Sequence, residues 1–203
     1  MLRPRPTTAA RADAQVAVET LDPDARLLEV IRLGHPILRH VAEPVSEDWF
    51  SSTCLVNLGN DMIRTMIEEN GVGLAAPQVA ESLRLFAFWV PETEDEPEIP
   101  PTVFANPEIR PIGEDSEEGW EGCLSIPGLR GLVPRHRRIK VKARGLDGEP
   151  VSLTADGFQA RVIQHEYDHL DGVVFLDRMT DIRSLAFEPE WERYILGVEP
   201  DDR

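Results

Sequence analysis

The chain has 203 residues, of which 41% are hydrophobic, so it is long enough for one domain with a sizeable core and a tail. Its formal net charge of −16 argues against direct binding to nucleic acid or to anionic lipid, because both require surfaces rich in Lys and Arg. The two cysteines, Cys54 and Cys123, are too few for a disulfide framework and are typical of a reducing compartment with free or metal-bound thiols.

Residues 1–26 are predicted to form a disordered extension. Arg3, Arg5 and Arg11, with few acidic neighbours, give it some likeness to an organelle transit peptide, but it has no apolar secretory segment. We therefore expect a cytoplasmic protein of bacterial type, with organellar targeting as the alternative. No membrane association is expected, because the longest apolar run, 85–90, is too short to span a bilayer.

Residues 27–180 are predicted to form the folded domain. Apolar residues recur at helical spacing over 55–66 and predict a helix that ends at 70–71. The next stretch, 71–78, is rich in glycine and alanine, which let another backbone approach closely. It lacks the Lys-Ser/Thr ending of a phosphate loop. Residues 83–90 then predict a strand.

Two acidic segments, 91–101 and 113–119, are predicted to be solvated connections. The first contains five acidic residues and no basic residue. Between the two segments, an extended stretch begins at Phe104, and we expect Pro107 and Pro111 to break it.

A hairpin and a helix are predicted in the second half of the chain. Polar and apolar residues alternate over 138–144, which indicates a half-buried strand. A turn at 147–148 leads into a returning strand at 151–155. Asp156 is then placed to cap a helix that stops at Gly172.

This last helix contains two histidines four residues apart, His165 and His169, with Glu166 directly after the first. Residues i and i+4 share a helix face, so both imidazoles can bind one ion. Glu166 lies about 100° around the helix, where it can reach a water on that ion. This is the HExxH arrangement of metal-assisted hydrolysis. Phe158 and Val162 continue the line of the two histidines, which predicts a site in the core.

The third metal ligand distinguishes the classes of HExxH enzyme. A metzincin would have a third histidine at position 175, which is Phe175 here. A thermolysin-like glutamate could be Glu188 or Glu190, but Pro189 lies between them and is expected to interrupt a helix. Cys123 is the better candidate, because a thiolate is a strong ligand for Zn or Fe(II). Taken alone, Cys123 would be better explained as a small buried hydrophobic residue, and its neighbours in the sequence favour the ligand role.

Three segments together resemble the peptide deformylase family. Residues 71–78 are similar to its Gly-x-Gly-apolar-Ala-Ala-x-Gln segment. Residues 121–125 are its Glu-Gly-Cys-Leu-Ser segment, and 164–170 are its Gln-His-Glu-x-Asp-His-Leu segment. Their order and spacing also agree, and the resemblance extends over 27–179.

The resemblance implies an α+β fold in which short antiparallel β-sheets surround a central buried helix that carries the HExxH motif. It implies three metal ligands, which are Cys123, His165 and His169. The ion would be Fe(II), although Zn, Ni or Co can occupy the same ligands. Glu166 would act as the general acid and base.

The resemblance also implies how substrate is held. The Gln78 side-chain amide and the Leu124 backbone N–H would donate to the oxyanion, and the Gly73 backbone would pair with the substrate chain. The apolar residues suited to a methionine pocket are Val72, Phe158 and Val162, although core packing explains them equally well.

The implied function is hydrolysis of the formyl group from N-formylmethionyl nascent peptides, with release of formate. One rival is a zinc endopeptidase of another HExxH class, which needs a third ligand other than cysteine. A second rival is a non-catalytic peptide-binding paralogue, against which the intact Glu166 argues. A deformylase acting on a specialised small molecule or peptide is a third alternative.

The C-terminal tail departs from some relatives, which dock on the ribosome through a basic helix. Residues 181–203 are predicted to be acidic and partly helical, around 191–196. From 179 onward there are seven acidic residues and three arginines, which argues against that docking mode and leaves transient ribosome association open. Arg130 is interpreted either as a residue that positions the loop after 121–125, paired with Glu121, or as an ordinary surface arginine.

Overall fold

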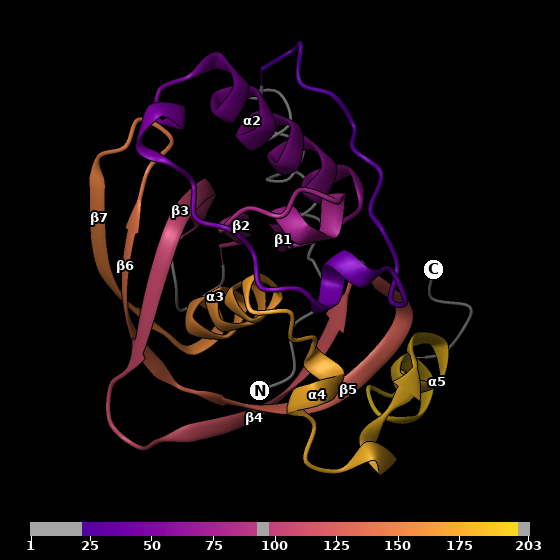
Figure 1. The fold of residues 1–203 in the computed structure, drawn as a ribbon. Helices are drawn as coiled ribbons and strands as arrows, with labels where there is room; N and C mark the ends of the chain where they lie inside the picture. Colours follow the sequence, from indigo (N-terminus) through magenta and orange to yellow (C-terminus); the bar gives the residue numbers. More distant parts are fainter. Residues whose placement is uncertain (1–21, 93–97, 199–203) are drawn as a thin grey trace.

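The computed structural model describes residues 22–92 and 98–198 and has an α+β fold. A five-stranded antiparallel sheet and a three-stranded antiparallel sheet lie on either side of the helix α3 (Gly157–Leu170) (Figure 1). A second long helix, α2 (Thr53–Glu68), covers the other face of the five-stranded sheet. The predicted fold class, α+β with antiparallel sheets around a helix, is confirmed at this level.

The helix α2 follows the predicted apolar pattern. The Ser52 side chain caps its first turn by accepting a hydrogen bond from the Leu55 N–H at 3.2 Å. Leu55, Met62 and Met66 are fully buried against the sheet. The helix ends before Asn70, which has a φ of +56° and reverses the chain direction as a left-handed C-terminal residue does.

The five-stranded sheet has the order β1–β2–β3–β6–β7. Its strands are β1 (Gly73–Ala75), β2 (Leu85–Val90), β3 (Ile99–Pro111), β6 (Arg138–Arg144) and β7 (Pro150–Asp156). Every residue of β2 is buried, because alternate side chains pack toward α2 on one face and toward α3 on the other. The alternating strand predicted at 138–144 is confirmed as β6.

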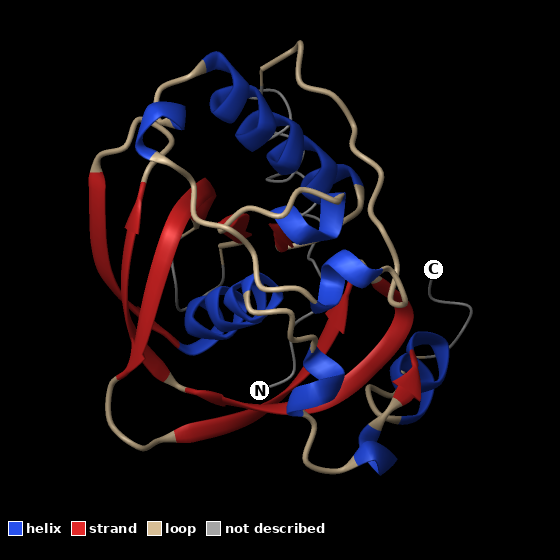
Figure 2. Cartoon of the chain, viewed as in Figure 1, coloured by secondary structure: helices blue, strands red, loops and turns tan. Residues whose placement is uncertain are grey.

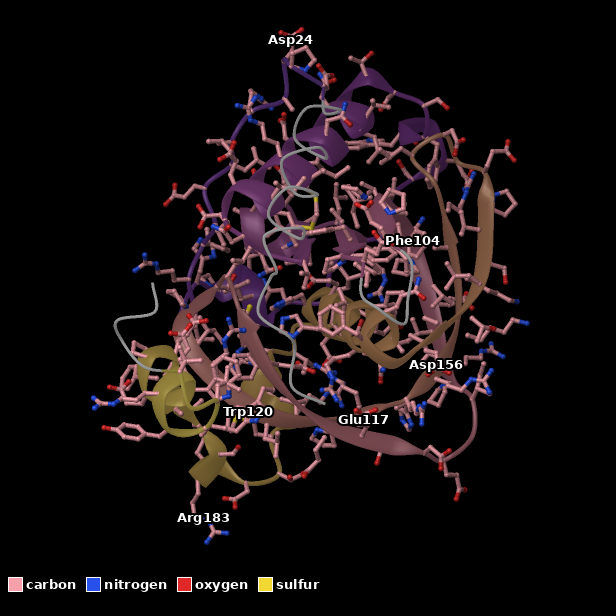
Figure 3. All side chains as sticks on the ribbon, turned by 180° about the vertical axis from the view of Figure 1, so that it is seen from behind. Asp24, Phe104, Glu117, Trp120, Asp156 and Arg183 are labelled. Atoms are coloured by element: carbon pink, nitrogen blue, oxygen red, sulfur yellow. The ribbon has the colours of Figure 1, made fainter. Side chains whose placement is uncertain are left out.

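The expectation that the extended segment is broken was wrong for Pro107, whereas the strand does end at Pro111. The strand β3 continues through Pro107 because the ladder to β6 has an irregularity between Ala105 and Glu108, where a missing N–H is tolerated. Asn106, with a φ of +49°, turns its side chain to Val45, whose N–H and carbonyl it binds at 2.8 Å. Phe104, labelled in Figure 3, packs in the core between the sheet and α3.

The two predicted acidic connections are shorter than expected. In the first, residues 93–97 lie outside the described residues, and β3 already begins at Ile99. In the second, β4 begins at Ser116, so only 112–115 connect two strands. Pairing with β5 explains why the strand includes these acidic residues. Glu117 and Glu118 pair with β5 through their backbone, and their side chains remain exposed to solvent.

The three-stranded sheet consists of β4 (Ser116–Cys123), β5 (Ile126–His136) and β8 (Ala186–Phe187) (Figure 2). Two short helices, α4 (Phe175–Arg178) and α5 (Glu188–Tyr194), pack against it. Pro189 lies in the first turn of α5 and does not interrupt a helix, since the first N–H groups of a helix have no partner within it. Single 3-10 turns occur at Pro36–Arg39, Glu47–Trp49, Ala76–Val79 and Ile182–Ser184.

The helix α3 starts and stops where the sequence predicts, with one difference in its cap. Asp156 occupies the N-cap position, but its side chain pairs with Arg137 and Arg138 and makes no cap hydrogen bond. Gly172, with a φ of +71°, ends the helix region. A Cβ at this glycine would lie 2.7 Å from the backbone of Arg39, so the close approach of the chain requires glycine.

Residues 22–26 of the predicted extension lie along α2. Arg26 pairs with the buried carboxylate of Asp61, and Arg64 donates to the Ala25 carbonyl at 2.9 Å. Residues 1–21 and 199–203 lie outside the described residues, so the boundaries predicted at 26 and 180 stay predictions. Within the described part of the chain, no helix is long and apolar enough to cross a membrane.

Candidate metal centre

Three potential metal ligands converge between the three-stranded sheet and α3. Cys123 ends β4, whereas His165 and His169 lie one turn apart on α3. Their ligand atoms all lie within 4.8 Å of one another, and Cys123 Sγ is 3.3 Å from His169 Nε2. A thiolate with two imidazoles is a donor set typical of Zn or Fe(II), and three protein ligands leave a coordination position for water. The three side chains therefore fit a divalent ion.

The two imidazoles are prepared for this role by different surroundings. His165 Nδ1 lies 2.8 Å from Glu121 Oε2, which leaves Nε2 free for an ion. Burial alone would lower the pKa of His165, but its hydrogen bonds with Cys123 and Glu121 raise that pKa well above its ordinary value. The hydrogen bond to Glu121 keeps a proton on Nδ1, whereas the raised pKa describes a second proton on Nε2, which a bound ion would displace. Burial and the charge of His165 lower the pKa of His169 well below its ordinary value, so this ring is neutral.

Glu166 points from α3 toward β1. A Cβ at Gly73 would lie 2.1 Å from Glu166 Oε1, so the carboxylate lies directly against the backbone of this strand. Its second oxygen, Oε2, is buried and has no hydrogen-bond partner among the described residues. Burial raises the pKa of Glu166 to about 7. A buried carboxyl that has one oxygen without a hydrogen-bond partner and a pKa near 7 can accept and return a proton near neutral pH.

The Gln78 amide is held in one orientation. Its Oε1 accepts a hydrogen bond from the Ala75 N–H at 2.8 Å. The NH₂ group must therefore face the other way, where Nε2 is 3.4 Å from Cys123 Sγ and 3.2 Å from Ser125 Oγ. Gln78 is buried, in the turn that follows β1. Its donor is thus aimed at the metal ligand Cys123.

Comparison with known proteins decides the family. The model of the family described as polypeptide deformylase matches residues 27–184. This chain belongs to the peptide deformylase family. Peptide deformylase 1 of Xanthomonas axonopodis pv. citri is 46% identical over 163 residues, which cover 79% of this chain and 94% of that protein. Peptide deformylase 1 of Prochlorococcus marinus is 46% identical over 168 residues, 81% of this chain and 86% of that one.

Solved structures of peptide deformylases share the fold. The class I type b peptide deformylase from Acinetobacter baumannii bound to Met-Ala-Ser has a TM-score of 0.72 and 42% identity, covering 76% of this chain and 99% of that one. The peptide deformylase from Thermotoga maritima has a TM-score of 0.68 and 38% identity, covering 77% of this chain and 99% of that one. The family predicted from three short segments is therefore confirmed.

The residues predicted to line a methionine pocket all belong to the core around α3. Val162 is 4% exposed, and Phe158 is half-buried beside it. Val72 touches both this cluster and the one beneath α2. These contacts are those of core residues, so their role toward a substrate stays a prediction. The structure places Leu124 in the turn between β4 and β5, directly after Cys123.

Sequence reasoning missed the buried ion network behind His165. Arg135 donates to both oxygens of Glu121, at 2.9 and 3.0 Å, and to Asp168 at 2.5 Å. Burial would raise the pKa of Glu121, but the hydrogen bond from His165 and the charge of Arg135 hold that pKa well below its ordinary range. A signal was present in the sequence, because Arg135 continues the buried face of β5 two residues after Val133.

The suggested pairing of Arg130 with Glu121 was wrong. Glu121 is already bound by Arg135, Arg161 and His165. Arg130 pairs instead with Glu188, which lies in the segment predicted to be the C-terminal tail. The sequence did not indicate that Glu121 pairs with Arg135 or that Arg130 pairs with Glu188, because both ion pairs depend on how β5 packs against other segments.

We expect Arg135→Met to lower the free energy of unfolding by about 3–5 kcal/mol, because two buried carboxylates would lose their shared partner. Urea unfolding followed by circular dichroism measures this difference. Arg138→Met is the matched control, since Arg138 begins β6, the next strand along the chain, and forms an exposed pair with Asp156. A loss for Arg135→Met as small as that of the control would contradict the network's structural role.

We expect Gly73→Ala to lower turnover by about 100-fold, the size of effect that a displacement near 1 Å produces at a reacting group. The added methyl group would overlap the Glu166 carboxylate and push it away from β1. Steady-state kinetics with the metal content measured in the same sample separates this effect from loss of the ion. Wild-type turnover in this variant would show that the carboxylate need not lie against Gly73.

Proposed function

We propose that this chain hydrolyses the formyl group of N-formylmethionyl nascent peptides and releases formate. Membership of the peptide deformylase family supports this activity. The observation that carries the proposal is the convergence of Cys123, His165 and His169 beside the buried carboxylate of Glu166, whose Oε2 has no hydrogen-bond partner among the described residues. A binding module would not need a carboxylate whose pKa is raised to about 7 next to a metal site.

The three ligands would hold one divalent ion, which we assign as Fe(II), with Zn, Ni or Co as ions that the same donors accept. Such an ion supplies Lewis-acid polarisation of the formyl oxygen and a lowered pKa for the attacking water. The mixed sulfur and nitrogen donor set supports this choice of ions. An iron enzyme with a thiolate ligand should lose activity in air, whereas a nickel-loaded one should keep it.

We assign the proton transfers to Glu166, so that His165, Glu166 and His169 act as an HExxH motif. Glu166 takes a proton from the attacking water and later passes it to the leaving amine of methionine. Its open Oε2 and its raised pKa support this role, because both allow one group to act first as base and then as acid.

We assign stabilisation of the developing oxyanion to the Gln78 side chain and the Leu124 backbone N–H. The orientation of Gln78 supports its role, since the hydrogen bond from Ala75 keeps the amide oxygen turned away. A neutral, preorganised donor stabilises charge that appears only during the reaction. Leu124 follows the ligand Cys123 directly, so its backbone is tied to the position of the ion.

We propose that the peptide pairs with the backbone of Gly73 on β1. This strand lies at the edge of the five-stranded sheet, and an edge strand can accept an added chain. The Acinetobacter relative was solved with Met-Ala-Ser bound, which supports a peptide as the ligand class. Val72, Phe158 and Val162 would line the pocket for the methionine side chain.

The contacts of the candidate site residues argue against two of the alternative functions. A thermolysin-like peptidase would use Glu188 or Glu190, yet Glu188 pairs with Arg130. A non-catalytic paralogue would not require the orientation of Gln78 described above. A deformylase specialised for another formylated small molecule or peptide is tested by the choice of substrate. Cytoplasmic location and transient ribosome association stay predictions.

The test is purification under anaerobic conditions, measurement of bound metal, and an assay of formate release from a formyl-methionyl tripeptide. We expect one ion per chain and formate from the formylated peptide, with none from the acetylated analogue. No formate from protein loaded with iron, nickel or cobalt would overturn the proposal.

A further inference from the structure

Residues 186–194 form an element that lies beyond the family match, which ends at residue 184. Strand β8 pairs with β5, so that Arg130 lies opposite Ala186 and Leu129 opposite Phe187. The helix α5 then folds back over the same sheet (Figure 1). This arrangement brings Glu188 and Trp191 onto β5 and β4, close to the segment that ends in Cys123.

Two residues of this element hold the side chain of Arg130. Glu188 accepts hydrogen bonds from Arg130 Nε, at 3.0 Å, and from its Nη2. The guanidinium also lies over the ring of Trp191, 5.5 Å from its centroid. Trp191 in turn packs against Trp120 on β4, with ring centroids 6.0 Å apart; Figure 3 shows Trp120 beside α5.

Arg130 covers the backbone directly before the metal ligand. A Cβ at Gly122 would lie 2.5 Å from Arg130 Nη1, so the guanidinium packs on the α-carbon of this glycine. The β4–β5 ladder has an irregularity between Glu121 and Cys123, so regular pairing does not hold the chain at Gly122. A glycine at such a point is flexible unless a neighbour restrains it.

We propose that the segment 186–194 is a positioning element for the metal centre, in which Glu188 and Trp191 hold the Arg130 guanidinium against Gly122 and thereby fix the backbone that leads into Cys123. The inference rests on the proposed function, since it takes Cys123 as a metal ligand. The ligand atoms are not among the hydrogen-bond and ring partners of these three residues, so their effect is on the placement of the thiolate.

Metal retention is the direct readout of this role. Protein loaded with Co(II) is mixed with an excess of a chelator, and loss of the thiolate-to-cobalt absorption band gives the rate of release. We expect Glu188→Ala to release cobalt about fivefold faster than wild type, the size of effect typical of a partly exposed ion pair. Glu188→Gln keeps an oxygen acceptor, so its rate of cobalt release should lie between those of wild type and Glu188→Ala. Trp191→Leu should release cobalt about as fast as Glu188→Ala.

The matched control is Glu190→Ala, because Glu190 is an exposed acid on the same helix. Its release rate and its absorption band should equal those of wild type. The urea midpoints of all variants show whether faster cobalt release comes from unfolding of α5. A change in the position of the cobalt band in Glu188→Ala at an unchanged midpoint would support positioning, since a merely structural contact would leave the band where it is.

Two results would overturn the inference. Release rates and bands for Glu188→Ala and Trp191→Leu equal to those of Glu190→Ala would show that Arg130 and Glu188 form a surface pair without influence on Cys123. Wild-type protein that holds no cobalt through a thiolate and releases no formate would reject the proposed function and the positioning role together. Normal wild-type behaviour with unaffected variants rejects the positioning role alone.

Discussion

Replacing Glu166 with glutamine is expected to lower formate release by about 10²–10⁴-fold, the usual contribution of a general acid and base. The substitution removes the group that accepts and returns the proton but keeps the shape of the side chain against Gly73. The ion should stay bound, because Glu166 is not among the three converging ligands. Single-turnover formate release, with metal content measured on the same sample, checks both statements.

Glu190→Gln is a suitable control for the loss of one carboxylate, since Glu190 is exposed on α5. It should leave the rate unchanged. Full activity of Glu166→Gln would show that Glu166 does not transfer the proton and would favour a mechanism that uses another base. Loss of the ion in this variant would instead place Glu166 in the coordination set.

Cys123→Ala is expected to weaken metal binding by at least about 100-fold, because even residues that only orient ligands contribute 10–100-fold to affinity. The two histidines on α3 would remain, but two imidazoles alone leave half of a tetrahedral site open. Competition with a chromogenic chelator gives the affinity directly. Formate release should be lost in parallel and should not return when the substrate concentration is raised.

Cys54→Ala is the matched control, since Cys54 is the second cysteine and lies exposed at the start of α2. Its affinity and activity should equal those of wild type. Unchanged metal affinity in Cys123→Ala would favour the zinc endopeptidase reading, because a residue other than cysteine would then complete the site.

The local features of this protein follow from its sequence because they depend on neighbours along the chain. The spacing of His165 and His169 places both rings on one helix face whatever the helix packs against. Alternation over Arg138–Arg144 likewise predicts which side chains of β6 are buried. The identity of the third ligand was reached through resemblance to a family, since Cys123 is 42 residues away from His165 in the sequence.

The features that sequence reasoning missed are contacts between distant segments. Pro107 was expected to end a strand, but a bulge in the pairing with β6 accommodates it. Arg130 was linked to Glu121, whereas Arg135, Arg161 and His165 already bind the Glu121 carboxylate and Arg130 pairs with Glu188. Propensity describes a residue's own backbone, and neither bulges nor ion pairs between strands are encoded at that level.

The sequence by itself determined the chemistry: a thiol, two imidazoles, a carboxyl and an amide, of the types that hydrolysis at a metal ion requires. Only the tertiary structure decided how these groups are held. It gave His165 its partner Glu121, fixed the amide of Gln78 through Ala75, and placed Glu188 over Arg130. The physical reason is that residue types set which bonds can form, whereas packing of the chain sets which partners are within reach and which groups are removed from water.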